Sequence, residues 1–196
     1  MTDQAARSDR ELLAAWRSGD REAADELIER HGPGLYGFFA GKLGRGADAC
    51  CLRTFAAWQQ PPRPDAPSGI RSELLALARV ELLAHLREGE REIDPDHHCI
   101  AELEPGLTEV VATRAPQRRL LHALRRLPID DQIALELRHW EALDELELAA
   151  VLATTPAELG ERLSRATDQL ERRLAASTAV DAPTMEAPGP RDDRSR

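Results

Sequence analysis

The fold is decided by residues 144–165, which read DELELAAVLATTPAELGERLSR. Asp144 is placed to cap a short helix. The next helix begins at Pro156, where a missing amide hydrogen is tolerated, and Thr155 with Glu158 forms a capping box over its first turn. A short helix, a turn of about three or four residues and a longer helix are typical of a helix-turn-helix. This unit lays its second helix in the major groove of DNA.

The remaining sequence also predicts helices. Leu, Ala, Glu and Arg dominate, and apolar residues recur at spacings of three and four without β-branched runs. Ser8 and Glu11 form another capping box. Helices are expected over 9–17, 46–59, 70–88, 116–126 and 156–175, with further ones starting at Asp20 (kinked or restarted at Pro33) and at Pro128.

The predicted fold class is all-α, with two small helical domains joined by an acidic linker. Residues 1–91 are expected to form the first helical domain and residues 116–175 the second, which holds the helix-turn-helix. Residues 92–115 contain six acids, one arginine, two prolines and one glycine, which is typical of a flexible linker. Residues 176–196, rich in Pro, Asp and Arg, are predicted to be disordered.

The composition of the chain argues against several classes of function. Its 196 residues carry a net charge of -9, which argues against coating DNA or an acidic membrane by bulk attraction. More than half of that charge lies in residues 92–115, so the two helical domains are close to neutral. Spanning a bilayer takes about 20 consecutive apolar residues, and the sequence has no such run and no signal peptide at its start. We therefore expect a cytoplasmic protein without membrane insertion.

Three cysteines, Cys50, Cys51 and Cys99, cannot all pair, and free buried thiols are expected. His97 and His98 precede Cys99, and together with Cys50 or Cys51 these residues would make four ligands for zinc. Adjacent loop residues seldom coordinate one ion, however, and no second pair has the spacing of metal ligands. No nucleophile–base pair, paired carboxylates or phosphate-binding loop stands out either. We expect no metal, no cofactor, no catalytic residue and no enzyme activity.

Two segments of the chain resemble the conserved regions of sigma factors of the extracytoplasmic-function type. The motifs that resemble region four lie at 124–128, 135–141, 143–152 and 162–166, and those that resemble region two lie at 11–13, 19–23, 35–36, 47–49, 54–55 and Trp58. The resemblance implies a subunit that directs RNA polymerase core to specific promoters. Such a subunit initiates transcription by binding and melting promoter DNA.

The resemblance also implies roles for individual residues. The polymerase-docking helix would carry Leu52, Arg53, Thr54, Phe55 and Trp58. The DNA-melting helix would carry Arg71, Arg79 and Arg87, after a base-capturing loop at 61–68. The DNA-binding residues of the recognition helix would be Thr155, Glu158, Glu161, Arg162 and Arg165. Arg162 and Arg165 share a helix face, from which they could contact DNA phosphate or guanine. Alternatively, this face is solvated and both arginines form ion pairs with nearby acids of the same helix. Trp16, Trp58 and Trp140 lie on apolar stripes and are expected in the core.

The sequence departs from the family in places that bear on function, and in the melting helix Val80 and Ala84 stand where Asn and Asp are common. The docking helix is about three residues shorter than usual, and Glu158, Gly160 and Glu161 stand where Thr, Lys and Ser are typical. One alternative is therefore a diverged sigma-like regulator or protein-interaction module with weak or no promoter melting. A dimeric helix-turn-helix repressor is another. For the sigma factor, the expected partners are RNA polymerase core, promoter DNA and an anti-sigma factor. The acidic linker would act as a nucleic-acid mimic or as a solvated spacer.

Overall fold

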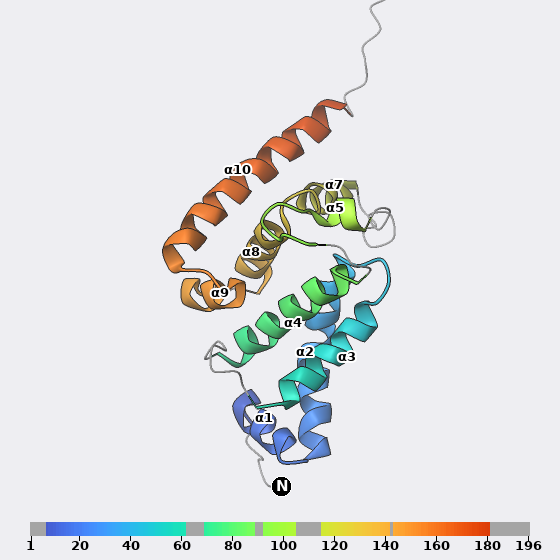
Figure 1. Cartoon of the computed structure of the whole chain (residues 1–196), viewed down its shortest axis with the longest axis vertical. Coiled ribbons are helices and arrows are strands. Elements are labelled where there is room, and N and C mark those ends of the chain that lie inside the picture. The colour runs from blue at the N-terminus through green and yellow to red at the C-terminus, as the bar shows by residue number, and fades with distance from the viewer. Residues whose placement is uncertain (1–6, 62–68, 89–91, 105–114, 142, 181–196) are drawn as a thin grey trace, which may run out of the picture.

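The computed structural model describes residues 7–61, 69–88, 92–104, 115–141 and 143–180, and every regular element in these ranges is a helix (Figure 1). The helices are α1 Asp9–Arg17, α2 Arg21–Ala40, α3 Ala47–Gln59, α4 Ile70–Leu86, α5 Ile100–Leu103, α7 Ala115–Leu124, α8 Ile129–Trp140, α9 Glu145–Leu152 and α10 Pro156–Val180. The all-α fold class is confirmed for this part of the chain. The loop at 62–68 and the tail from 181 onward lie outside the described residues.

The first two helices begin at the residues that the sequence predicts. The Ser8 hydroxyl accepts from the Glu11 amide at 3.4 Å, while the Glu11 carboxylate accepts from the Ser8 amide at 2.8 Å. Asp20 caps α2 by accepting from the Ala23 amide. Helix α2 then runs through Pro33 without a break, so the expected restart there is wrong. Because Pro33 is exposed, the backbone hydrogen bond that it removes lies on the solvent side.

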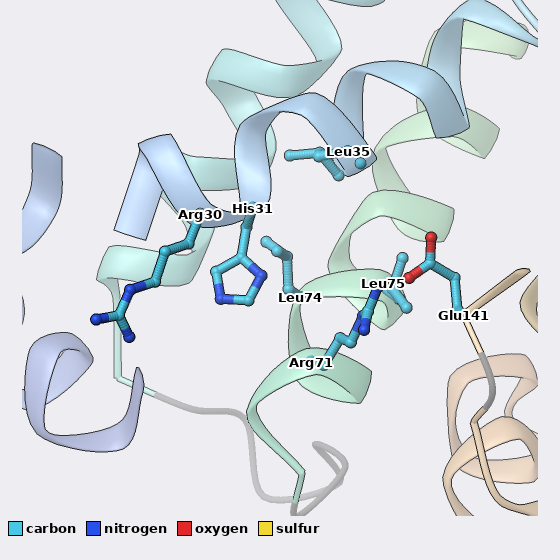
Figure 2. Close-up of a pocket in the computed structure, with 8 residues that line it drawn as sticks. Arg30, His31, Leu35, Arg71, Leu74, Leu75 and Glu141 are labelled. Carbon is cyan, nitrogen blue, oxygen red and sulfur yellow. Dashed lines mark hydrogen bonds and ion pairs between the residues drawn. The ribbon is translucent and has the colours of Figure 1, made fainter. Parts of the chain in front are cut away.

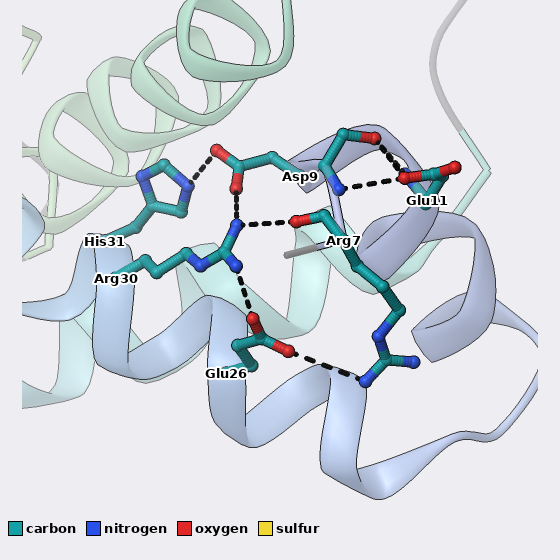
Figure 3. Close-up of polar contacts among 7 residues, drawn as sticks. Arg7, Asp9, Glu11, Glu26, Arg30 and His31 are labelled. Carbon is teal, nitrogen blue, oxygen red and sulfur yellow. Dashed lines mark hydrogen bonds and ion pairs between the residues drawn. The ribbon is translucent and has the colours of Figure 1, made fainter. Parts of the chain in front are cut away.

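A polar network fastens α1 to α2 (Figure 3). The Asp9 carboxylate accepts from Arg30 Nη1 at 2.7 Å and lies 2.8 Å from His31 Nε2. Arg30 also pairs with Glu26 and donates to the Arg7 carbonyl at 3.0 Å. Burial by itself raises the pKa of Asp9, but Arg30 and His31 together hold it below its ordinary value. These contacts join the start of α1 to the middle of α2.

Aromatic side chains from α1 and α3 form the centre of the N-terminal core. Trp58 is fully buried, and its ring meets that of Trp16 edge-on at 6.3 Å and that of His31 at 5.6 Å. Phe55 lies 6.4 Å from Trp16. Such edge-to-face and tilted arrangements are favourable for aromatic pairs. Helix α3 is therefore held to α1 and α2 by its inner face.

The predicted helix-turn-helix is present at the C-terminal end. Asp144 caps α9 by accepting from the Glu147 amide at 2.8 Å. Ala153 ends α9 in the left-handed conformation, with a φ of 53°, and this residue turns the chain toward α10. Helix α10 begins at Pro156 and continues to Val180, about one turn beyond the predicted end near residue 175.

The described part of the predicted linker, residues 92–104, packs against the C-terminal helices. Ile93, Cys99 and Ile100 are buried. The His98 carbonyl accepts from the Ile129 amide at 3.0 Å, and the Ala101 amide donates to the Arg125 carbonyl at 2.8 Å. This segment therefore follows the junction of α7 and α8 rather than running free. The remainder of the expected linker, residues 105–114, lies outside the described residues.

The two predicted helical domains are in contact along α4. Helix α4 packs against α9, and one hydrophobic cluster extends from Leu12 in α1 to Leu159 in α10 (Figure 1). A smaller cluster around Leu124, Leu127 and Leu135 fills the space beneath α10. The division into separate domains stays a prediction, because burial is continuous across the boundary that the sequence indicates.

The prediction that Trp140 lies in the core is wrong. Its side chain is 61% exposed, whereas Trp16 and Trp58 are buried as expected. The apolar spacing from Leu137 to Trp140 is regular, but Trp140 is the last residue of α8, and none of the described helices covers it. Helical periodicity identifies a face; it does not say how far along the helix that face is covered.

Candidate nucleic-acid interface

The turn of the helix-turn-helix uses Glu158 as a cap. Its carboxylate oxygen Oε2 accepts from the hydroxyls of Thr154 and Thr155 at 2.8 and 2.9 Å and from the Thr155 amide at 3.0 Å. The Glu158 amide in turn donates to the Thr155 hydroxyl at 3.3 Å. The Thr155 amide and both hydroxyls hold the pKa of Glu158 below its usual value. Both side chains, predicted to bind DNA, are therefore engaged in fixing the start of α10.

Arg162 is turned inward from α10. Its side chain is only 15% exposed, and Nη1 lies 2.7 Å from Asp96 and 3.0 Å from the buried Asp131 on α8. Burial raises the pKa of Asp131, against the opposing pull of Arg162. Arg162 thus ties the recognition helix to α8 and to the segment that follows α4. This arrangement differs from the predicted contact of Arg162 with DNA.

The outer face of α10 keeps Glu161 and Arg165 exposed. Leu159 and Ala166 are buried on the opposite side and anchor the helix to the core. Of the two arginines predicted to bind DNA through this helix, Arg165 is the one whose side chain is exposed to solvent. An exposed guanidinium on such a helix has the geometry to reach phosphate or the guanine edge.

The arginines of α4 and the arginine that caps its C-terminal end contact segments that follow α4 in the chain. Arg79 makes a bidentate pair with the buried Asp130 of α8, at 2.7 and 2.6 Å. Arg71 pairs with Glu141, just after α8. Arg87 donates to the Ile93 carbonyl at 3.3 Å. All three side chains predicted to contact melting DNA therefore have partners within the chain.

Only part of the predicted polymerase-docking set is on the surface of α3. Leu52 is 71% exposed, and Arg53, 42% exposed, pairs with Glu81 of α4 at 2.9 Å. Thr54, Phe55 and Trp58 are buried, and the Thr54 hydroxyl donates to the Cys50 carbonyl at 2.8 Å. These three side chains build the core, as expected for Trp58, and their burial differs from the docking role that the resemblance implies for them.

Sequence reasoning missed a set of buried charges between α2 and α8. Lys42, the only lysine in the chain, is 1% exposed and pairs with Glu136, which also accepts from Gln132 at 2.7 Å. The Lys42 ammonium lies 3.9 Å above the Phe38 ring and donates to the Phe38 carbonyl at 2.9 Å. A single lysine among 25 arginines was the signal available in the sequence.

A small cavity lies where α2, α4 and the residue after α8 meet (Figure 2). It has a volume of about 50 Å³, which leaves room for a few water molecules. Leu35, Leu74 and Leu75 line one side, and the Arg71–Glu141 pair closes the other. This polar and apolar lining marks a contact between the two halves of the chain.

The thiols are poorly disposed for metal or redox chemistry. Cys50 and Cys99 are buried, and burial raises the pKa of both thiols. Burial, together with the neighbouring Cys50 and Asp48, raises the pKa of Cys51 to about 11. Among the described residues, no group of three or more His, Cys, Asp and Glu side chains is arranged to hold a metal ion.

Comparison with known proteins identifies a likeness along nearly the whole chain, although no family model matches it. The ECF RNA polymerase sigma factor RpoE of Cereibacter sphaeroides is 26% identical over 181 residues, which cover 89% of this chain and 100% of that protein. The chain is therefore similar to an extracytoplasmic-function sigma factor over nearly its whole length. A solved structure of the sigma factor CnrH in complex with the cytosolic domain of CnrY has the same fold.

The sigma-factor likeness to CnrH has a TM-score of 0.61 at 24% identity and covers 86% of this chain and 97% of that chain. The sigma-factor relatives are not enzymes. No helix in the described part of the chain is long and apolar enough to cross a membrane.

Proposed function

We propose that the protein is a sigma factor that brings RNA polymerase core to specific promoters and initiates transcription there. The observation that carries the proposal is the likeness to a named polymerase sigma factor over that protein's full length. The helix-turn-helix of α9 and α10, with its exposed outer face, supports a role in reading promoter DNA. The chain itself then needs no catalytic residue, because the polymerase performs the chemistry.

Helix α3 offers the surface for the polymerase. Leu52 is a large apolar side chain exposed on a helix whose opposite face is locked into the core by Phe55 and Trp58. Such a rigid helix can present an apolar anchor without much loss of conformational entropy on binding. Arg53 beside it is held by Glu81, so its guanidinium is positioned in advance.

Replacing Leu52 with Glu is expected to weaken binding to core polymerase about tenfold or more, because a charge replaces an interface anchor. Fluorescence anisotropy of labelled protein titrated with core polymerase measures this. Tyr36→Glu, at another exposed hydrophobic position, is the matched control and should change binding little. Equal losses for both variants would contradict docking through α3.

Replacing Arg165 with Ala is expected to weaken promoter binding about tenfold, or about 1.4 kcal/mol, without lowering the melting temperature. Arg172→Ala, about 10 Å further along the exposed side of α10, is the control and should have a smaller effect. Arg162→Ala should lower the melting temperature, because it leaves the buried Asp131 without its partner. Promoter affinity that falls only with Arg162→Ala would overturn this assignment.

The proposal includes a regulatory protein partner. CnrH, the sigma factor of similar fold, was solved with the cytosolic domain of CnrY. By the same likeness, we infer that this chain binds an anti-sigma factor. Co-purification from the native bacterium, followed by identification of the bound proteins, tests this part of the proposal.

The runner-up function is a sigma-like regulator that does not melt promoters. The pairing of Arg71 and Arg79 with acids of the chain itself favours it, since both arginines belong to the predicted melting helix. Fluorescence of 2-aminopurine in the promoter separates the two functions. A rise on adding protein and core polymerase supports the sigma factor, and binding without a rise supports the regulator.

A further inference from the structure

In the part of the chain that the structure describes, three ion pairs connect the N-terminal helices to α8 and its end, and we call this contact the seam. It consists of Lys42–Glu136, Arg79–Asp130 and Arg71–Glu141. In each pair the cation comes from α2, its end or α4, and the acid comes from the C-terminal half. The partners lie 94, 51 and 70 residues apart in the chain, so none of the pairs stabilises a helix locally.

The seam becomes more exposed from one side to the other. Lys42 and Glu136 are buried, Arg79 is 14% exposed at its side chain over the buried Asp130, and Arg71 is 53% exposed. Buried charges add little net stability compared with apolar side chains, but they penalise any arrangement that leaves them unpaired. A contact of this kind therefore favours one closed arrangement of the two halves. When the halves separate, water can hydrate the charged side chains.

Closure affects the two candidate DNA surfaces differently. The outer face of α10 stays exposed with Arg165, so the recognition helix remains available. Helix α4 instead lies against α9, and its Arg71 and Arg79 already have carboxylate partners. Phosphates would have to displace Asp130 and Glu141 to reach these cations. The closed molecule is therefore equipped to read DNA and poorly equipped to melt it.

We propose that the seam is an intramolecular latch, which holds the protein in a resting state with its DNA-melting helix blocked by its own C-terminal half. The proposal rests on the proposed sigma-factor function. Opening the seam frees Arg71 and Arg79, while Glu141 and Asp130 become hydrated. The cavity beside Leu74 and Leu75 marks where packing across the seam is incomplete, next to its most exposed ion pair (Figure 2).

The test uses Glu141→Arg in the full chain, which places a second cation against Arg71 at the exposed side of the seam. Asp130→Asn is the second variant, and it removes the bidentate partner of Arg79. Glu145→Arg makes the same charge change at an exposed position of α9 outside the three pairs and serves as the control. Circular dichroism checks that each variant is folded, and small-angle scattering measures the radius of gyration.

The two seam variants are expected to have a larger radius of gyration than the wild type and the control. Their affinity for core polymerase and promoter together should rise about tenfold, as expected if the closed form holds about nine-tenths of the wild-type molecules. Adding Arg71→Glu to Glu141→Arg restores attraction across the seam and should restore the compact radius. Expansion that persists in this double variant would overturn the latch, as would an unchanged radius in both seam variants.

An increased radius without a gain in affinity would overturn the inhibitory role. If neither wild type nor any variant binds core polymerase, the proposed function fails, and the inhibitory role fails with it. Scattering reports closure independently of polymerase. Failure of the latch and failure of the proposed function are therefore distinguishable.

Discussion

Replacing Glu136 with Ala is expected to lower the free energy of unfolding by about 3 to 5 kcal/mol. Among the described residues, the substitution leaves the buried Lys42 ammonium without a counter-charge, with the Phe38 carbonyl and ring as its remaining partners. Urea denaturation followed by circular dichroism measures the change. Glu145→Ala, at an exposed position of α9, is the control and should stay within about 0.5 kcal/mol of wild type.

The pair Lys42→Met with Glu136→Leu should recover most of that loss. Apolar side chains of similar size replace buried ion pairs with little net effect or even a gain in stability. A loss below about 1 kcal/mol for Glu136→Ala would mean that Lys42 is hydrated in solution. That result would contradict a closed seam.

Replacing Trp58 with Ala is also expected to cost about 3 to 5 kcal/mol, because it removes a fully buried ring from the centre of the N-terminal core. Its contacts with Trp16, Phe55 and His31 are lost together, and these residues come from α1, α2 and α3. The same urea denaturation measures the effect.

Trp140→Ala is the matched control for Trp58→Ala. The same side chain is removed, but from a position that is 61% exposed, so the change should stay within about 0.5 kcal/mol. A comparable loss at both positions would mean that Trp140 is covered in solution.

Local signals in the sequence predicted the helices well. Ser8 with Glu11 and Thr155 with Glu158 form the hydrogen bonds that a capping box requires, at the expected ends of α1 and α10. These interactions span three residues, so the chain needs no tertiary context to specify them. The helix-turn-helix could be predicted for the same reason.

Contacts between distant segments could not be predicted. Arg162 and Arg165 lie three residues apart on α10, yet the first turns inward to Asp131 and the second is exposed. Periodicity gives the face of a helix but not the acids that another helix will bring to it. For the same reason, the sequence did not predict that Arg79 pairs with Asp130, 51 residues away. It also did not predict that Thr54 and Phe55 of the docking helix are buried.

Transcription in a reconstituted system tests the central claim most directly. Purified protein, core polymerase from the native bacterium and fragmented genomic DNA are combined, and run-off transcripts are sequenced. The sigma-factor function predicts a small set of transcripts with shared upstream sequence elements, absent without the protein and reduced by Leu52→Glu. The absence of any protein-dependent transcript, together with failure of the wild type to co-elute with core polymerase, would contradict it.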